Sequence, residues 1–326
     1  MKKSAGFRAS IQAEQQEMTS MRYRSFTDVI DAARTRPPVK MSVAAAHDRD
    51  VLDAVKAAVE LGIIEPYLVG DPKKIFELAK EIDFSVEEYP VYPAYTEKEN
   101  AFIAAKLASE GHVQIIMKGF VNSTPFLKGV LHKELNLKTG SVISHISVFD
   151  IPGAARLISM SDGGINIAPD FQQKKQIILN AVEFLDRIGV DRPRVAILAA
   201  NERVSEKMPV TVEADHLAML IKNEASQELL IEGPLPLDLA ISRESLLHKG
   251  LESELEGEAD LLIVPTIEAG NFLGKAITYF AQGTMAGIVL GAKVPLVLNS
   301  RSDTAEAKLA SIALAVVAAS NTTVSV

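Results

Sequence analysis

The chain of 326 residues contains neither cysteine nor tryptophan. Without cysteine there are no disulfides, no thiolate metal sites and no cysteine nucleophile. The longest apolar-rich run covers residues 309–319, well short of the ~20 residues that a membrane-spanning helix needs. Two lysines near the start are followed by no apolar stretch, so no signal peptide is expected. These absences together favour a cytoplasmic protein without a membrane segment.

An excess of basic residues is also missing. The formal net charge is −8 and the sequence pI is near 5.4, which argues against a general nucleic-acid binder, because such proteins usually carry a basic face. Any anion site must therefore be built from local positive groups. Hydrophobic residues make up 48% and charged residues 23% of the chain, as in ordinary globular proteins. The length favours two domains over one.

Strand and helix patterns alternate along the first part of the chain. Short apolar runs at 41–46, 63–69 and 113–117 predict strands, and the segments 97–109 and 124–131 predict helices. Asp48 is expected to cap a further helix, and the sequence Gly70-Asp71-Pro72 to begin another. Such alternation predicts a largely parallel sheet with helices on both faces.

The pattern changes near residue 141. Two β-rich runs joined by Asp150-Ile-Pro-Gly153 predict a hairpin. Further strands are expected at 195–200, 261–264 and 294–298, and further helices at 174–188, 211–223 and 303–319. The division expected from this change is a flexible extension at 1–20, a first domain at 21–145 plus 291–326, and a second domain at 146–290.

Polar loops follow three of the predicted strands. Ligands of open parallel sheets bind beyond the carboxyl ends of the strands, where helix N-termini offer free N–H groups to anions. Two of the loops carry a cation, Lys118 or Arg301, as a phosphate-bearing ligand requires. The candidate ligand-binding residues in these loops are Lys118, Asn122, Ser123, Thr124, Gly270, Asn271, Ser300 and Arg301.

Structural interpretations of these residues stay open beside the functional ones. The segment 302–304 with Glu306 fits a helix N-cap, and Gly270-Asn271 fits a simple turn. Arg301 is the hardest to interpret structurally, because a loop arginine after a buried strand needs an anionic partner. The sequence has no P-loop, no G-x-G-x-x-G after the first strand and no G-x-S-x-G, which disfavours P-loop kinases, dinucleotide-binding folds and α/β hydrolases.

Four segments carry a family resemblance. Residues 117–131, 233–238, 262–271 and 294–303 resemble, in order and spacing, the phosphate acetyltransferase/phosphate butyryltransferase family. The likeness runs from about residue 41 to the C-terminus. The last segment reads Ser-Arg-Ser-Asp, where the acetyltransferases have Ser-Arg-Gly, so the butyryltransferase branch is the more similar.

The resemblance implies a fold and a reaction. The fold would be a two-domain α/β architecture like that of isocitrate and isopropylmalate dehydrogenases, with mostly parallel sheets and a cleft between the domains. The reaction would be acyl-CoA + phosphate ⇌ acyl phosphate + CoA, with a butyryl or branched short-chain acyl group favoured and acetyl as the alternative. Family members are homodimers that use coenzyme A as a substrate and need no metal or tightly bound cofactor; nucleic acids and membranes are not expected partners.

The resemblance also suggests catalytic roles. It implies that Arg301 binds phosphate and that Ser300 steadies the transition state. The proposed base of the acetyltransferases falls near Ala307 here, so Asp303 and Glu306 become the candidates. Without cysteine, direct transfer in a ternary complex is favoured, and a serine acyl-enzyme stays open. An isocitrate-dehydrogenase-like oxidoreductase and a non-catalytic CoA binder are the alternatives of other classes.

Acyl-chain preference is the least determined property at this stage. Phe120, Phe126 and Leu127 lie near the predicted cleft. They are candidates for an acyl pocket, and they fit a hydrophobic core equally well.

Overall fold

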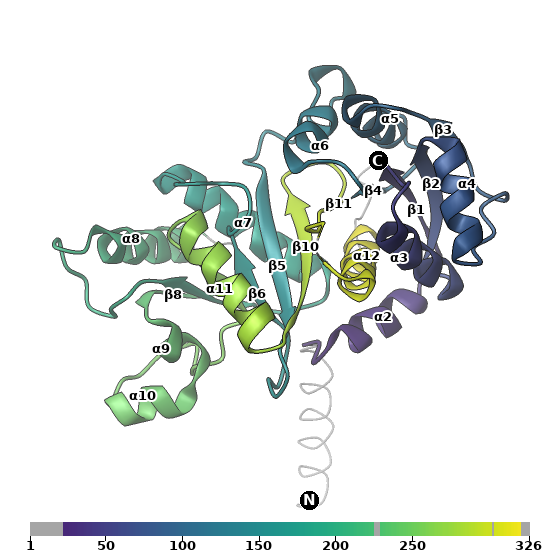
Figure 1. Ribbon diagram of the computed structural model, residues 1–326. Coiled ribbons are helices and arrows are strands. Elements are labelled where there is room, and N and C mark those ends of the chain that lie inside the picture. Colours follow the sequence, from purple (N-terminus) through teal and green to yellow (C-terminus); the bar gives the residue numbers. More distant parts are fainter. Residues whose placement is uncertain (1–21, 225–228, 302, 321–326) are drawn as a thin grey trace, which may run out of the picture.

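The computed structural model describes residues 22–224, 229–301 and 303–320 (Figure 1). The predicted extension at 1–20 lies outside these residues. Eleven strands form the framework of the described chain: β1 (Val39–Ala44), β2 (Ile64–Gly70), β3 (Val91–Pro93), β4 (Ile115–Lys118), β5 (Ser144–Asp150), β6 (Ile158–Ser161), β7 (Arg194–Leu198), β8 (Leu230–Leu235), β9 (Leu261–Ile263), β10 (Thr284–Leu290) and β11 (Leu296–Val297).

All eleven strands belong to one sheet, in the order β3-β2-β1-β4-β11-β10-β5-β6-β9-β7-β8. The sheets that the sequence predicted for two domains are therefore one continuous sheet, and the predicted domain boundaries stay a prediction. Seven of the ten strand pairs are parallel. The three antiparallel pairs lie in the middle, where β10 pairs with β11 and β5, and β5 pairs with β6. The mixed α/β class and the β5–β6 hairpin are confirmed.

Helices cover both faces of the sheet (Figure 1). Their bounds are α2 (Phe26–Arg34), α3 (Arg49–Glu60), α4 (Pro72–Glu81), α5 (Glu97–Ser109), α6 (Ser123–Val130), α7 (Phe171–Arg187), α8 (Pro209–Glu224), α9 (Leu237–Ile241), α10 (Arg243–Lys249), α11 (Ile267–Phe280) and α12 (Ala305–Ser320), with one 3₁₀ turn, η1 (Lys133–Leu135).

The helix starts follow from local capping. The Asp48 carboxylate accepts a hydrogen bond from the Val51 N–H (3.1 Å), and Asp71 does the same for the N–H of Lys73 (3.1 Å). Thr96 forms a capping box with Glu99 at the start of α5. Each of these side chains satisfies a donor that the first turn leaves unpaired. The predicted starts at Asp48 and Asp71 are confirmed.

One hydrophobic core runs under the whole sheet, while the other face has two separate cores. The continuous core packs α2, α3, α4, α7, α8 and α12 against one side of the strands. On the other side, α5 and α6 cover the half around β1 and β4, and α9, α10 and α11 cover the half around β7 and β9. Helix α11 also reaches the central strands, because its side chains pack with Phe149 of β5 and Met285 of β10.

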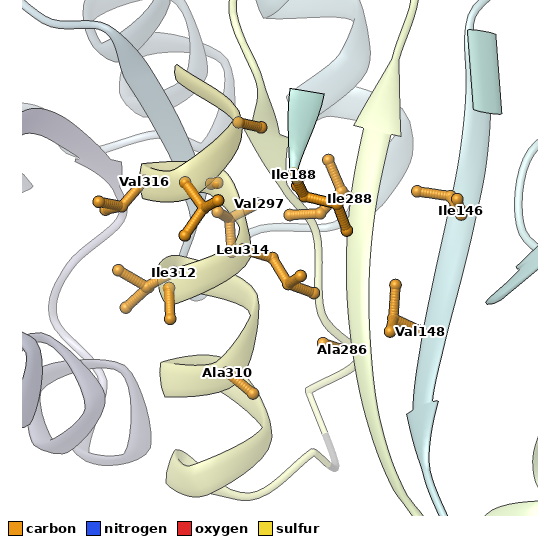
Figure 2. Close-up of a cluster of buried hydrophobic side chains, with 14 of the residues drawn as sticks. Ile146, Val148, Ile188, Ala286, Ile288, Val297, Ala310, Ile312, Leu314 and Val316 are labelled. Atoms are coloured by element: carbon orange, nitrogen blue, oxygen red, sulfur yellow. The ribbon is translucent and has the colours of Figure 1, made fainter. Parts of the chain in front are cut away.

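Helix α12 anchors the continuous core (Figure 2). Eleven of its sixteen residues are buried, as expected for a helix that is apolar on all sides. Ile312, Leu314 and Val316 are fully buried in the cluster that also contains Ile288 and Val297 of the central strands. The prediction of a buried helix over 309–319 is confirmed, and no described helix is both long and apolar enough to cross a membrane. A rigid α12 fixes the position of the loop that precedes it.

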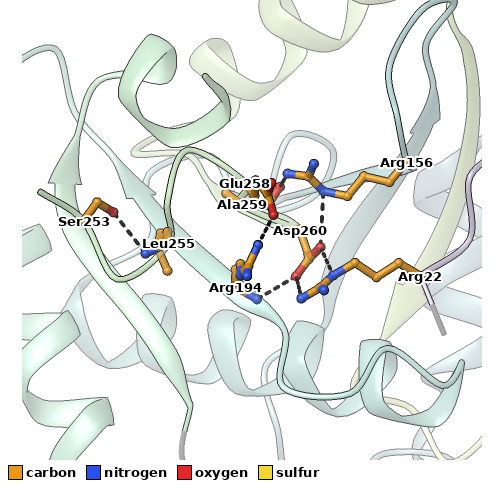
Figure 3. Close-up of polar contacts among 8 residues, drawn as sticks. All are labelled: Arg22, Arg156, Arg194, Ser253, Leu255, Glu258, Ala259 and Asp260. Carbon is orange, nitrogen blue, oxygen red and sulfur yellow. Dashed lines mark hydrogen bonds and ion pairs between the residues drawn. The ribbon is translucent and has the colours of Figure 1, made fainter. Parts of the chain in front are cut away.

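Asp260 joins the first residues of three neighbouring strands (Figure 3). It lies just before β9 and is 4% exposed. Its carboxylate accepts hydrogen bonds from Arg22 (2.8 and 3.1 Å) and from the backbone N–H of Arg194 (2.8 Å), and it pairs with Nε of Arg156 at 3.4 Å. These contacts join the amino-terminal ends of β6, β7 and β9. The cluster is therefore a structural one, on strands that are separated from β4 and β11 by β10 and β5.

Candidate active site

Two of the predicted polar loops meet at the carboxyl edge of the sheet. Strands β4 and β11 are parallel neighbours, with Met117 opposite Val297, so the loops that follow them lie side by side. A small pocket there is lined by Lys118, Ser300 and Arg301, together with Asp48, Val51, Gly119, Phe120, Asn299 and Lys308. The structure thus brings together Lys118, Ser300 and Arg301 from segments about 180 residues apart in sequence.

Lys118 is a buried cation in this pocket. It is 4% exposed, and its ammonium makes only long hydrogen bonds to the carbonyl oxygens of Gly119 (3.4 Å) and Val121 (3.3 Å). Burial, followed by repulsion from Arg301 and Lys308, lowers the pKa of Lys118 to about 8. An anion bound among these three cations would relieve that repulsion.

Arg301 is held at the mouth of the pocket. Its guanidinium carbon lies 4.8 Å from the ring centroid of Phe120, a cation–π contact, and Nη2 lies 3.4 Å from Oε1 of Glu97. The same Glu97 oxygen accepts hydrogen bonds from Asn122 N (3.1 Å) and Nδ2 (2.9 Å). Both side chains of the Arg301–Glu97 pair are more than 40% exposed, so a phosphate can replace the carboxylate at little cost.

Lys308 and Glu97 were missed by the sequence analysis. Lys308 is 4% exposed, and its ammonium donates a hydrogen bond to the Asp303 carbonyl oxygen. It lies seven residues after Arg301, and only the actual start of α12 at Ala305 determines which way it faces. Glu97 opens α5, a helix that the sequence did predict, but nothing local indicates that this helix begins beside Arg301.

The two predicted bases have different surroundings. The Asp303 carboxylate accepts hydrogen bonds from Ser300 N (2.8 Å) and Asn299 Nδ2 (3.4 Å), so it shapes the loop that carries Ser300. Glu306 is exposed in the first turn of α12. The predicted cap at 302–304 is borne out at Thr304, whose hydroxyl accepts a hydrogen bond from Ala307 N (3.2 Å).

The start of α6 brings a second group of predicted residues to the site. Asn122, Ser123 and Thr124 are exposed there, and the helix begins at Ser123 with Asn122 as its N-cap. Gly119 makes the preceding turn possible, because a Cβ at this position would lie 2.4 Å from the Ala45 carbonyl oxygen. Ser123 lines a larger cavity next to the cationic pocket.

The prediction for Gly270 and Asn271 needs a correction. They were expected before a helix, with free N–H groups after Gly270, but α11 begins at Ile267, and Gly270 N donates to Thr266 O (3.2 Å) within the helix. Gly270 instead allows α11 to pack closely against the loop at Gly163, because a Cβ added at position 270 would lie 2.6 Å from the Cα of Gly163. Gly270 and Asn271 still line the larger cavity.

The larger cavity has a volume of about 270 Å³ and lies between α6 and α11. It is lined by Ser123, His145, Ser147, Met160, Gly163, Gly164, Gly270, Asn271, Gly274, Lys275, Met285, Leu298, Asn299 and Ser300. Asn299 and Ser300 also line the cationic pocket, so the two spaces adjoin at these residues. Anion and neutral ligand groups can therefore bind next to each other.

His145 forms part of the cavity floor. It is 6% exposed, and its Nδ1 lies 3.4 Å from Oγ of Ser147. Burial lowers the pKa of His145 more than the nearby Asp162 carboxylate raises it, so the ring is neutral near pH 7. Asp162 itself accepts hydrogen bonds from the N–H groups of His145, Gly164 and Ile165 (3.1, 2.8 and 2.9 Å). Asp162 therefore shapes the loop over the cavity.

The family model described as "Phosphate acetyl/butaryl transferase" matches residues 93–316. This range contains the cationic pocket's loops and most of the sheet. The chain belongs to this family.

Relatives within the phosphate acetyl/butyryl transferase family extend the match. A phosphate butyryltransferase from Clostridium beijerinckii is 39% identical over 91% of this chain and 98% of its own length. A phosphate acetyltransferase from Rhizobium meliloti is 37% identical over 88% of this chain and 91% of its own length. A branched-chain phosphotransacylase from Enterococcus faecalis V583 superposes with a TM-score of 0.77 at 31% identity, over 86% of this chain and 99% of that chain.

The family assignment confirms the expected class. The chain is a phosphate acyltransferase, as the resemblance of its four segments predicted. An isocitrate-dehydrogenase-like oxidoreductase finds no support in these relatives. Which acyl group is transferred, and which residues do the chemistry, are questions for the site geometry.

Proposed function

We propose that the protein transfers a butyryl or branched short-chain acyl group between coenzyme A and inorganic phosphate, with acetyl as the alternative substrate. The observation that carries this proposal is that Lys118, Arg301 and Lys308 line one pocket, beside a cavity whose described lining residues include no carboxylate. Phosphate would occupy the cationic pocket. The acyl thioester would lie toward the cavity, with its carbonyl at the shared Ser300.

Each residue has a proposed role in a ternary complex. Arg301 holds phosphate oxygens through its planar fork of donors, and Lys118 and Lys308 balance the remaining charge. Ser300 donates to the carbonyl oxygen as negative charge develops on it. Phosphate attacks the carbonyl carbon directly, the C–S bond breaks, and CoA leaves as the thiolate. In the reverse direction, Glu306 or Asp303 accepts the thiol proton.

Coenzyme A is a substrate in this scheme, and the residues named need no metal or tightly bound cofactor. We further propose a cytoplasmic homodimer of two-domain subunits. Supporting the dimer, α11 presents Phe272, Tyr279 and Phe280 at 70%, 63% and 89% exposure, and clusters of exposed large apolar side chains mark interaction surfaces. Analytical ultracentrifugation measures this state directly, and a monomer at micromolar concentration would contradict it.

The proposed reaction is tested with the purified protein. Butyryl-CoA, isobutyryl-CoA and acetyl-CoA are each mixed with phosphate, and thiol release is followed with a chromogenic disulfide. We expect phosphate-dependent release, fastest with butyryl or branched substrates. If no acyl-CoA gives phosphate-dependent release while CoA still binds in calorimetry, the chain is a non-catalytic CoA binder.

The pKa of Lys118 predicts a pH dependence of phosphate binding. Below about pH 8 the free protein carries the Lys118 charge, and above it the charge is lost. Because phosphate favours the protonated lysine, its affinity falls as pH rises through 8, with KM increasing up to about tenfold per pH unit. Initial rates between pH 7 and 9.5 measure this. Lys118→Met should bind phosphate weakly and show no inflection near pH 8; an inflection that persists would assign it to another group.

A further inference from the structure

The floor of the larger cavity is a row of small or flexible side chains. Ser147 and Met160 lie opposite each other on β5 and β6 and line the cavity. Gly287, opposite Ser147 on β10, is covered by the His145 ring and the Leu298 carbonyl oxygen. Two residues away on β5, the same face of the sheet carries Phe149 on one side and His145 on the other, because side chains alternate along a strand. The cavity therefore lies over Ser147 and Met160, between the larger side chains of Phe149 and His145.

The opposite wall of the cavity also carries small residues. Helix α11 faces the cavity with Gly270, Asn271 and Gly274. A Cβ placed on Gly274 would lie 3.4 Å from Cζ of Phe149 and 3.6 Å from Cε of Met160. These are ordinary contact distances, so the position has room for a methyl group without displacing its neighbours. The absent side chain at 274 thus leaves space directly above Met160.

The charge of the cavity suits an apolar group better than a phosphate. Its apolar side chains are Met160, Met285 and Leu298, and none of the described residues that line it is a carboxylate. Its one ammonium, that of Lys275, lies 6.0 Å from the Tyr279 ring centroid, on the exposed side of α11. Phe126 is fully buried in the hydrophobic core with α5, and the Phe120 ring is in contact with the Arg301 guanidinium. Neither of these two candidates from the sequence therefore lines this cavity.

We propose that this cavity receives the acyl chain, and that Ser147 and Gly274 set the chain length by leaving space on opposite walls. The proposal rests on the proposed acyl transfer, because it places the thioester carbonyl at Ser300, where the cavity meets the cationic pocket. A chain of four carbons or a branched chain extends from there toward Met160. One methylene in an apolar enzyme pocket changes kcat/KM by about 10- to 200-fold.

The test compares chain lengths in variants that fill each wall. Ser147→Val and Gly274→Ala are assayed with acetyl-, propionyl-, butyryl- and isobutyryl-CoA at saturating phosphate. For each variant we expect the ratio of butyryl to acetyl kcat/KM to fall about 10-fold or more, with the phosphate KM unchanged. Met160→Ala should act in the opposite direction and improve the use of hexanoyl-CoA.

Ser159→Val is the matched control. Ser159 precedes Met160 on β6 and is likewise buried at 3% exposure, but it lines a small space beside Tyr23 and Leu157 on the other face of the sheet. It should leave the butyryl-to-acetyl ratio at the wild-type value. A loss of folding in Ser147→Val leaves Gly274→Ala as an independent test, since its methyl group meets only ordinary contacts.

Two results would overturn the assignment of this cavity to the acyl chain, and a third would overturn the proposed acyl transfer on which it depends. If all acyl-CoA substrates decline by the same factor, the cavity holds another part of coenzyme A. If Ser159→Val shifts the ratio as much as Ser147→Val, the effect is one of general stability. If the wild-type protein releases no thiol with any acyl-CoA in the presence of phosphate, the proposed function itself fails, which the wild-type assay shows separately.

Discussion

Replacing Arg301 by alanine is expected to lower kcat/KM for phosphate by about 100- to 1,000-fold, the usual cost of losing one aligned donor in an enzyme site. Arg301 is placed at the mouth of the cationic pocket by its contact with the Phe120 ring, 4.8 Å away, and by Glu97. Its side chain is 46% exposed, so its loss should leave folding intact. Steady-state kinetics at several phosphate concentrations measure the change.

Two further variants sharpen this prediction. Arg301→Lys keeps the charge but loses the planar fork, so it should recover only part of the activity. Arg34→Ala is the matched control, because Arg34 is 55% exposed on α2, where it forms an ion pair with Asp31 at 3.6 Å. It should behave as wild type. Normal phosphate kinetics in Arg301→Ala would show that Lys118 and Lys308 hold the phosphate without it.

Replacing Asp260 by alanine is expected to destabilise the protein by about 3–5 kcal/mol. Removing one partner of a buried ion pair leaves the other charge uncompensated, which has this cost in measured cases. Here the remaining cations are Arg156 and Arg22, with side chains 17% and 26% exposed, and the Arg194 N–H also loses its acceptor. Burial already lowers the pKa of Arg156, and Asp260 is the main opposing influence.

Urea unfolding followed by circular dichroism measures the loss in Asp260→Ala. Asp31→Ala is the control, because Asp31 is 63% exposed in its pair with Arg34, and such surface pairs contribute about 0–1 kcal/mol. At temperatures where Asp260→Ala is still folded, its kinetics should be those of the wild type, since Asp260 and its arginine partners are not among the residues that line the cationic pocket or the larger cavity in the described chain. An unchanged urea midpoint would mean that water replaces the carboxylate.

Much of the fold could be predicted because its signals are local. Asp48, Asp71 and the Asp150–Gly153 turn act within a few residues of themselves, and the helix and strand they begin or join are where the sequence placed them. The placement of Gly270 and Asn271 in a loop was wrong, because a glycine inside a helix looks the same in sequence as one in a turn. The need for a glycine at position 270 comes from its close contact with Gly163, about 100 residues away in the sequence.

The site was predictable only in part, because some of its residues are brought together by contacts between distant segments of the chain. Lys118 and Arg301 were found because a cation after a buried strand is unusual by itself. His145 and Ser147 were not, since the alternation of side chains along a strand does not indicate which face will line a cavity beneath α11. That depends on the order of strands, with β10 and β5 between the two halves of the sheet.

The central place of β10 and β11 has a consequence for synthesis of the chain. Strand β11 is inserted between β4 and β10, although it is the last strand made. A growing polypeptide can pair β1 with β2 and β4 early, but Lys118 faces no arginine until residues 296–308 have been added. The anion pocket thus forms only after β11 has been made. A ribosome-bound fragment that ends before β11 has ten of the eleven described strands and no phosphate site.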